Sequence, residues 1–347
     1  MSDSNSIAEP APAKAAWREI VTRYQQPSLV RALWQILDTF VPYALIWYAM
    51  YLTLQVSWWL TLPLAVVAGG LLIRIFIIFH DCGHGSYFKS RRANDIVGFI
   101  AGVLTFTPYY HWRWEHAIHH GTAGHLEKRG VGDIWTMTVQ EYLASSRWNK
   151  FAYRLARNPF VLFVVAPIFI FMARQRFPSR TADQRERHSV VWMNLAILCL
   201  AAALSWVFGI GSYLFVQLVV VGVGGAGGIW MFYVQHQFED AYWEREGAWD
   251  YTAAALKGSS YYKLPRVLQW FSGNIGFHHI HHLSARVPNY NLQRCHEADP
   301  IFSQVKPITL LSSLNAGTLR LWDEQNKKLV SFAHLRRAHR KESERKK

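Results

Sequence analysis

The chain has 347 residues, enough for one large domain or two modest ones, and 51% of them are hydrophobic, with 16 Trp, 16 Tyr and 20 Phe. Its formal net charge is +14, and the charged residues lie between apolar blocks. This pattern favours an anionic membrane surface or an acidic partner protein over nucleic acid as the binding partner. Three dispersed cysteines, Cys82, Cys199 and Cys295, exclude a disulfide framework and a thiolate metal site, and they indicate a reducing compartment.

The N-terminal stretch, residues 1–30, opens with the polar, Ala- and Pro-rich sequence "MSDSNSIAEPAPAKAAW". It lacks the apolar core that a secretory signal needs. We therefore expect a short, flexible, polar N-terminal arm.

Four apolar blocks follow, near residues 33–55, 58–79, 190–209 and 212–235. Each is long enough to cross a bilayer as a helix, which takes about 20 residues. The two blocks of each pair are separated by very short links, so the pattern predicts two helical hairpins. Two shorter apolar runs, 96–108 and 159–173, fall short of a comfortable span and are interpreted as interfacial or re-entrant segments.

The distribution of Lys and Arg predicts the orientation of these spans. The hairpin tips carry none, whereas residues 80–189 and the C-terminal stretch "RRAHRKESERKK" carry many. The positive-inside rule then places both termini and residues 80–189 in the cytoplasm. The expected fold is an all-α integral membrane protein with four transmembrane helices, a cytoplasmic helical cap and a basic cytoplasmic tail over 321–347.

Histidines form three clusters, "HDCGHGS", "HWRWEHAIHHGTAGH" and "GFHHIHHL", with spacings that place several imidazoles on one face of a helix. A further histidine follows the fourth span. Because His80 and His236 lie at span ends on the same side, the topology gathers all the clusters there, provided that 96–108 and 159–173 do not cross. The nine residues are His80, His84, His116, His119, His120, His236, His278, His281 and His282.

Nine imidazoles suit two metal ions, since one ion takes about three to six ligands. Imidazole binds Fe, Zn, Cu and Ni, so the ligand set alone does not choose the metal. Zinc hydrolases generally use three protein ligands and an open position. Soluble di-iron bundles use Glu and Glu-x-x-His ligands, which this sequence does not offer.

The clusters resemble the three histidine boxes of membrane fatty acid desaturases, H-x(3,4)-H, H-x(2,3)-H-H and H/Q-x-x-H-H. The sequences around the boxes are similar to those of the acyl-lipid Δ12/omega-6 and bacterial Δ5 branch of the family. They are "HDCGHGSYF", "WRWEHAIHHGTAGHLEKRGVGDIW" and "GFHHIHHLSARVPNY". The similarity covers about residues 30–310, within a desaturase domain expected over 31–320. It implies two non-haem Fe ions that use O2 and two electrons to place a cis double bond in an acyl chain.

Carried over by position, the resemblance makes the eight box histidines iron ligands, with His236 a looser match to an additional ligand. Some relatives pair that histidine with an Asn four residues earlier, where this chain has Phe232. The implied substrate is a lipid or an acyl thioester. No "HPGG"-like cytochrome b5 segment is present, so electrons are expected from a separate donor such as ferredoxin or cytochrome b5. The implied location is a bacterial inner membrane.

Groups outside the iron shells are expected to orient the imidazoles through their second ring nitrogen. The candidates are Asp81, Glu115, Asp133, Glu239, Asp240 and, through water, Asn274. Asp81 and Glu115 are equally compatible with pairing to nearby arginines. The remaining histidines lie outside the spacing and are expected not to be ligands: His111, His125, His188, His279, His296, His334 and His339.

Two alternatives remain open from the sequence. The first is a di-iron membrane hydroxylase of an alkane, an acyl chain or a carotenoid. The second is a non-catalytic membrane metal-binding protein, either a transporter or a sensor. A transporter needs ionisable residues within its spans, and here the spans offer only Asp38 and Arg74.

Overall fold

The structure is a computed structural model that describes residues 12–337. Within that range the chain is mostly helical. The four long helices are α2 (Leu29–Leu54), α3 (Trp58–His84), α9 (Gln184–Phe208) and α10 (Ile210–His236). The shorter helices are α1 (Pro12–Tyr24), α4 (Arg91–Leu104), α5 (Tyr109–Thr122), α6 (Val139–Ala144), α7 (Arg147–Ala156), α8 (Ala166–Met172), α11 (Tyr251–Lys257), α12 (Arg266–Phe271), α13 (His278–Leu283), α14 (Asn289–His296), α15 (Pro300–Ser303) and α16 (Leu310–Ala316), with a π-helical turn (Val161–Val165) before α8 and a 3-10 turn (Arg174–Arg176) after it.

Two small sheets accompany the helices and correct the all-α expectation in detail. One has the order β1-β4-β5, with β1 parallel to β4 and β4 antiparallel to β5, and the other pairs β2 in parallel with β3. The strands are β1 (Met137–Thr138), β2 (Tyr261–Lys263), β3 (Pro307–Thr309), β4 (Leu321–Asp323) and β5 (Lys328–Val330). Strands this short do not show the alternation that reveals a strand in sequence.

The four long helices are the ones long and apolar enough to cross a membrane among the described residues. A fifth span would be possible only if α7 and the segment 161–176, which are bent by 58°, were counted as one. The predicted blocks therefore correspond to α2, α3, α9 and α10. Helix α3 continues five residues past its predicted end to His84, so the first histidine cluster extends a span without a break.

Local sequence signals set the ends of these helices. Ser28 and Ser57 are the N-caps of α2 and α3, and each side chain accepts a hydrogen bond from a backbone N–H in the first turn. A single residue, Gly209, separates α9 from α10, and its φ of 80° lies in the left-handed region that glycine adopts without strain. The reversal between α9 and α10 therefore depends on this glycine.

Close packing of α3 on α10 forms the centre of the molecule. Gly69 and Gly224 face each other so closely that a Cβ on Gly224 would lie 3.0 Å from the Gly69 carbonyl oxygen. Small residues at such a crossing let two helix backbones approach within a membrane. The approach determines how far apart the histidine-bearing ends of α3 and α10 lie.

A buried ion pair lies among the same helices. Arg74 on α3 is 6% exposed, its Nη2 is 3.3 Å from Asp38 on α2, and its Nε donates to Thr39 Oγ1 at 2.9 Å. The guanidinium also donates to the Trp270 carbonyl and lies 4.1 Å from the centre of the Trp270 ring. Its hydrogen bonds and paired charge are what make burial of this cation tolerable, and they join two long helices to α12.

Both ends of the described chain differ from the sequence-based expectation. The described part of the predicted 1–30 arm includes a helix, α1, whose Trp17 and Val21 are buried beside the α13–α14 region. The predicted tail over 321–347 begins as strands β4 and β5, with Trp322 only 1% exposed. Residues 1–11 and 338–347, including His339, lie outside the described residues.

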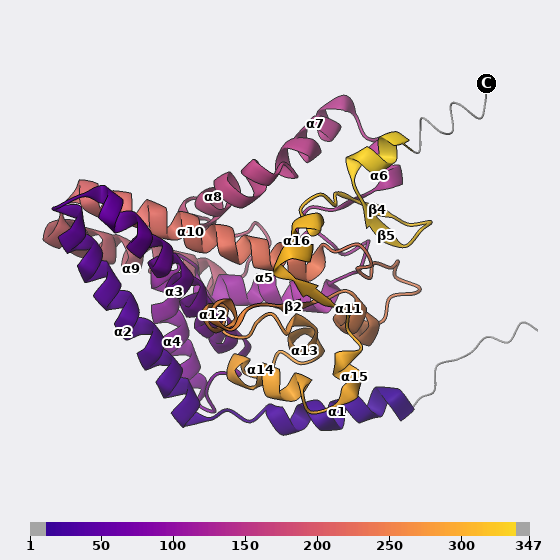
Figure 1. Cartoon of the computed structure of the whole chain (residues 1–347), viewed down its shortest axis with the longest axis horizontal. Helices are drawn as coiled ribbons and strands as arrows, with labels where there is room; N and C mark the ends of the chain where they lie inside the picture. Colours follow the sequence, from indigo (N-terminus) through magenta and orange to yellow (C-terminus); the bar gives the residue numbers. More distant parts are fainter. Residues whose placement is uncertain (1–11, 338–347) are drawn as a thin grey trace, which may run out of the picture.

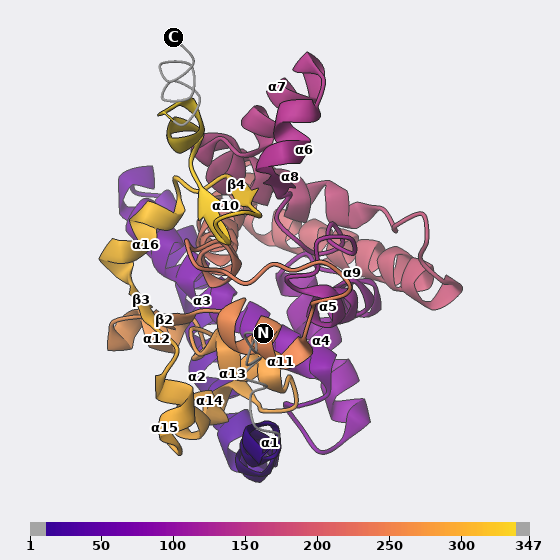
Figure 2. The same cartoon turned by 90° about the vertical axis from the view of Figure 1, so that its right-hand side faces the viewer.

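The long helices and the remaining elements occupy different parts of the molecule. Figure 1 shows α2, α3, α9 and α10 towards one side, with α11, α13, α14 and α15 on the other and α1 along the edge. In Figure 1 and in the perpendicular view of Figure 2, α7 projects away from the body. The ends of α3 and α10 that carry histidines face the group of short helices.

We predict that Gly224→Leu destabilises the protein, because the added side chain would push α3 and α10 apart at their closest approach. Overpacking of this kind costs about 1–3 kcal/mol. Thermal unfolding of the detergent-purified protein should show a lower midpoint. Gly228→Ala on the same helix is the matched control, since a Cβ there meets no atom within 4 Å. Equal midpoints for the two variants would contradict the packing role of Gly224.

Candidate metal centre

Four helices bring the nine predicted histidines together. His80 and His84 lie on the last turns of α3, His236 is the last residue of α10, and the second and third clusters lie on α5 and α13. Residues Gly273 and Asn274, with φ of 52° and 60°, form a left-handed turn five residues before α13. The third cluster follows this turn, and its His281 and His278 contact His80 and His236 at the ends of α3 and α10.

Five of the histidines form a first group, made of His80, His84, His116, His120 and His281, whose potential ligand atoms all lie within 4.8 Å of one another. The Nε2 atom of His116 is 3.1 Å from that of His80 and 3.1 Å from that of His120. The Nε2 atom of His281 is 2.9 Å from that of His120. The first group therefore joins all three sequence clusters around one point.

The second group contains His119, His236 and His282, again with ligand atoms within 4.8 Å. The Nε2 atoms of His119 and His236 are 3.2 Å apart, and the Nε2 atom of His278 lies 2.9 Å from that of His236. The three imidazoles of the second group and the adjacent His278 come from α5, α10 and α13. The structure thus places every predicted histidine in or directly beside one of two groups.

Three of these rings have their second nitrogen held by an acceptor. The Nδ1–H of His80 donates to Asp81 Oδ1 at 3.0 Å, and that of His119 donates to Asp133 Oδ1 at 2.7 Å. The Nδ1–H of His236 donates to the Gly258 carbonyl oxygen at 3.2 Å. Since these acceptors fix the proton on Nδ1, the Nε2 atoms of the three rings carry bare lone pairs.

The donor set fits a bound cation. The lone pairs of His119 and His236 face each other at 3.2 Å, an arrangement that is repulsive unless a positive charge lies between them. The Nε2 atoms of His84 and His282 are buried and have no hydrogen-bond partner. Buried polar atoms without a partner are costly, and coordination of a metal ion would satisfy them.

Burial favours the neutral form of five of the clustered imidazoles. Loss of solvent, and secondarily the neighbouring imidazoles, lowers the pKa of five of these side chains well below the usual range for histidine. Neutral imidazole is the form that binds a metal ion. The five are His116, His120, His278, His281 and His282.

Asp81 is the most firmly positioned of the predicted outer groups. Its Oδ2 accepts hydrogen bonds from the backbone N–H of Asn289 at 2.6 Å and from Asn289 Nδ2 at 2.8 Å. Gln35 on α2 donates in turn to Asn289 Oδ1 at 2.9 Å. The carboxylate that orients His80 is therefore held by α14, and α14 by a spanning helix. Nothing in the sequence spacing pointed to Asn289 or to Gly258.

The other predicted outer groups lie elsewhere. Glu115 accepts a hydrogen bond from Ser179 Oγ at 2.7 Å and lies 3.6 Å from Arg174, so of the two expectations for Glu115 the structure shows the arginine pairing. Asn274 Nδ2 donates to the Asn289 carbonyl, and Asn274 Oδ1 accepts from Gln269 Nε2, so its side-chain hydrogen bonds go to residues other than the clustered histidines. Glu239 and Asp240 are exposed.

Several histidines stay outside both groups, as expected. His279 turns to the opposite side of α13, where its Nε2 lies 3.1 Å from His296 Nδ1. His111 contacts Ser179, and His125 Nδ1 is 3.4 Å from Glu127. Phe232, at the position where an Asn was considered, offers no donor atom and packs its ring 5.2 Å from that of His119.

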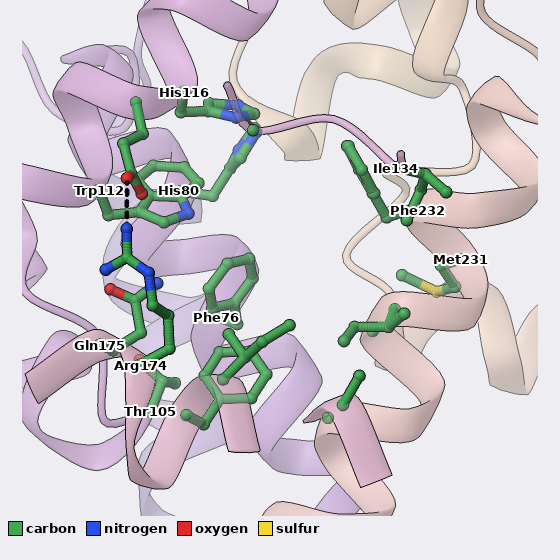
Figure 3. Close-up of a pocket in the computed structure, with 18 of the residues that line it drawn as sticks. Phe76, His80, Thr105, Trp112, His116, Ile134, Arg174, Gln175, Met231 and Phe232 are labelled. Carbon is green, nitrogen blue, oxygen red and sulfur yellow. Dashed lines mark hydrogen bonds and ion pairs between the residues drawn. The ribbon is translucent and has the colours of Figure 1, made fainter. Parts of the chain in front are cut away.

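A cavity of about 590 Å³ borders the first group through His80 and His116, and it also borders His278, beside the second group. Figure 3 shows His80, Trp112 and His116 on one wall, Ile134, Met231 and Phe232 on the other, and Phe76 between them. The Trp112 ring stacks on the His116 ring with centroids 4.3 Å apart. The apolar side chains of the lining come largely from α3, α8 and α10, so the cavity suits a hydrocarbon chain.

Fold and site together define a mostly helical protein with four helices long and apolar enough to span a membrane, and with histidine-rich groups suited to metal binding beside an apolar cavity. Residues 57–306 match the fatty acid desaturase family. The chain is 51% identical over 316 residues to a fatty acid desaturase of Bacillus subtilis, covering 91% of this chain and 90% of the relative. An sn-1 oleoyl-lipid 12-desaturase of Synechocystis is 29% identical over 251 residues, or 69% of this chain and 68% of the relative. A second Synechocystis relative, an sn-1 acyl-lipid omega-3 desaturase (ferredoxin), is 26% identical over 306 residues, or 82% of this chain and 77% of the relative.

The chain belongs to the fatty acid desaturase family. This membership confirms the resemblance inferred from the histidine boxes and makes the protein an oxidoreductase. The family assignment also agrees with the four apolar helices and with the two groups of histidines.

We predict that Asp133→Asn weakens metal binding about 10- to 100-fold, the usual effect of removing an outer carboxylate that orients a ligating histidine. Without the carboxylate, His119 loses the hydrogen bond that fixes its tautomer. The measurement is metal content after dialysis against graded chelator. Glu115→Gln is the control, because the Glu115 carboxylate pairs with Ser179 and Arg174 instead of a clustered histidine. Equal metal loss in both variants would remove Asp133 from this role.

Proposed function

We propose that this protein is an integral membrane acyl-chain desaturase with two non-haem irons held by the nine histidines. The observation that carries the proposal is the position of the two histidine groups. His80, His116 and His278 line the same apolar cavity that can hold an acyl chain. A chain in that cavity would have its methylenes beside His80 and His116 of the first group and beside His278, whose Nε2 lies 2.9 Å from that of His236 in the second group.

The irons, when bound, would supply the redox chemistry with O2 and two external electrons that converts two adjacent methylenes to a cis double bond. The protein's own residues orient the imidazoles and enclose the acyl chain. Asp81, Asp133 and the Gly258 carbonyl direct the imidazoles of three helices inward. Phe76 and Trp112 form apolar walls beside the histidines and exclude water from the reacting part of the chain.

The topology proposed with this function has four spans in two hairpins, with both termini and a helical cap bearing the metal site in the cytoplasm. The desaturase domain of residues 31–320 is joined by α1 and by strands β4 and β5, which pack onto it. The segments 96–108 and 159–173 are proposed to lie at the interface or to re-enter the membrane. A bacterial inner membrane is the proposed location.

The proposed substrate is an acyl-lipid, because the names of the two Synechocystis relatives specify lipid-linked acyl chains. The proposed selectivity is Δ12/omega-6 or Δ5. An acyl thioester is the alternative carrier. Electrons are proposed to come from a separate protein such as ferredoxin or cytochrome b5. The ferredoxin in the name of the omega-3 relative supports the first of these donors.

We predict that expression in a host with simple saturated and monounsaturated lipids yields acyl chains with a new double bond, located by mass spectrometry. The purified protein should contain about two irons per chain. Zinc alone would contradict the proposal, because zinc has no redox chemistry. A hydroxylated chain without a double bond would favour the hydroxylase alternative.

His281→Ala should abolish this product and lower the iron content while the protein remains inserted, because its Nε2 lies within the first group. His279→Asn is the matched control from the same six-residue helix. It should retain iron and product, since His279 faces His296 instead of the cluster. Iron loss of the same size in both variants would contradict the assignment.

We predict that Gly228→Leu shifts the protein towards shorter acyl chains. Gly228 lines the cavity, and a Cβ at this position meets no atom within 4 Å, so a larger side chain can occupy part of the 590 Å³. The length distribution of desaturated chains, measured by mass spectrometry in a host fed mixed fatty acids, is the readout. An unchanged distribution at normal protein levels would show that this part of the cavity does not hold the chain.

A further inference from the structure

One end of the cavity is polar and carries both signs of charge. Its lining there comes from the segment 174–181, which follows α8, and from Glu115 on α5. The ion pair between Arg174 and Glu115, at 3.6 Å, is the dashed contact in Figure 3. Figure 3 also places Gln175 beside Arg174, on the same side of the cavity as His80 and Trp112.

This polar end is also where the cavity reaches the surface. Among the lining residues, those that are exposed are Gly130, Gly132, Arg174 and Thr181. They lie in the loop after α5 and in the segment after α8. The remaining lining side chains are buried or half-buried, so the mouth of the cavity lies between these two segments.

The mouth contains polar atoms that the protein leaves unused. Gln175 is 8% exposed and its buried Oε1 atom has no hydrogen-bond partner. The Arg174 guanidinium donates to the Phe177 carbonyl and to Ser179 Oγ, yet its side chain remains 44% exposed. The site therefore offers one cation with free N–H groups, one carboxylate and one buried acceptor.

The surroundings suit a lipid head group better than a soluble carrier. Phe169 and Phe177, before and after Arg174 in the chain, are 59% and 67% exposed. Exposed aromatic side chains beside an arginine are typical of the membrane–water interface. A head group at this depth can stay among the polar side chains while its acyl chain extends past His80 and His116.

We propose that this mouth, made of Arg174, Glu115 and Gln175, binds the head group of a zwitterionic aminophospholipid. This rests on the proposed function and names its substrate class. The phosphate accepts hydrogen bonds from the Arg174 guanidinium, and the ammonium donates to the Glu115 carboxylate and to Gln175 Oε1. Because Arg174 and Glu115 lie side by side, a ligand with both charges matches the mouth, whereas an anion alone meets the carboxylate as well.

The test measures lipid retention without turnover. The full chain is purified from vesicles containing equal amounts of phosphatidylethanolamine, phosphatidylglycerol and a galactosyl diacylglycerol with identical acyl chains, and retained lipid is identified by native mass spectrometry. Phosphatidylethanolamine should be enriched over both others. Arg174→Gln should reduce its retention about tenfold, as loss of a charge-assisted hydrogen bond does, and Arg174→Lys should restore part of it.

Controls separate this site from the metal centre. Arg185→Gln removes a nearby arginine that lies over the Tyr110 ring, away from the cavity lining, and should leave retention unchanged. Iron content should be the same in Arg174→Gln and the unaltered protein. Glu115→Gln should selectively reduce the preference for phosphatidylethanolamine over phosphatidylglycerol.

The proposal is overturned if phosphatidylglycerol or the galactolipid is retained as well as phosphatidylethanolamine, or if Arg174→Gln matches the unaltered protein. Displacement of the bound lipid by acyl-CoA at equal concentration would also overturn it, in favour of a thioester carrier. Retention needs neither O2 nor electrons. A chain that selects phosphatidylethanolamine yet forms no double bond would therefore contradict only the proposed desaturase function.

Discussion

The constraint on which the structure depends is the convergence of nine buried or half-buried imidazoles, several of which direct ring nitrogens toward one another. His119 and His236 show it most clearly, because acceptors on their Nδ1 atoms force two bare Nε2 atoms to within 3.2 Å. Such an arrangement is stable only with a cation between the rings or with a fold rigid enough to hold them. The surrounding elements provide that rigidity: Asp81 and Asp133 orient the rings, and Asn289 holds Asp81 in place.

The same helices that bear the histidines also form the walls of the cavity. Helices α3 and α10 approach closely at Gly69 and Gly224, and further along each helix a histidine faces the site. Because the two helices are continuous from the packed crossing to His80 and His236, a shift at the crossing changes the distance between the two histidine groups. Helix packing and the geometry of the histidine groups are therefore coupled in this fold, and the acyl chain occupies the space between the two helices and α8 in the function that we propose.

The cavity changes character along its length, from apolar walls beside α3 and α10 to the charged mouth at Arg174 and Glu115. This gradient has a direct chemical meaning for an amphipathic substrate. The apolar part holds any hydrocarbon without regard to position, whereas a held head group would fix the distance from the carboxyl carbon to the histidines. In that arrangement the position of the double bond depends on the mouth as well as on the apolar part of the cavity.

The sequence by itself determined the long apolar helices, the histidine clusters and the family. Each of these depends on a local property: the length of an apolar block, the i,i+3 and i,i+4 spacing of histidines, or the sequence of a histidine box. It also separated His279 from His278, His281 and His282, and α13 presents them that way. It missed the short strands and the packed α1, since neither has a strong local pattern. Only the tertiary structure decided that Glu115 pairs with Arg174, that Asn289 holds Asp81 and that the Gly258 carbonyl holds His236. His236 and Gly258 are 22 residues apart in the chain, and Asp81 and Asn289 are 208 residues apart. No local spacing encodes a contact that forms only when distant elements pack.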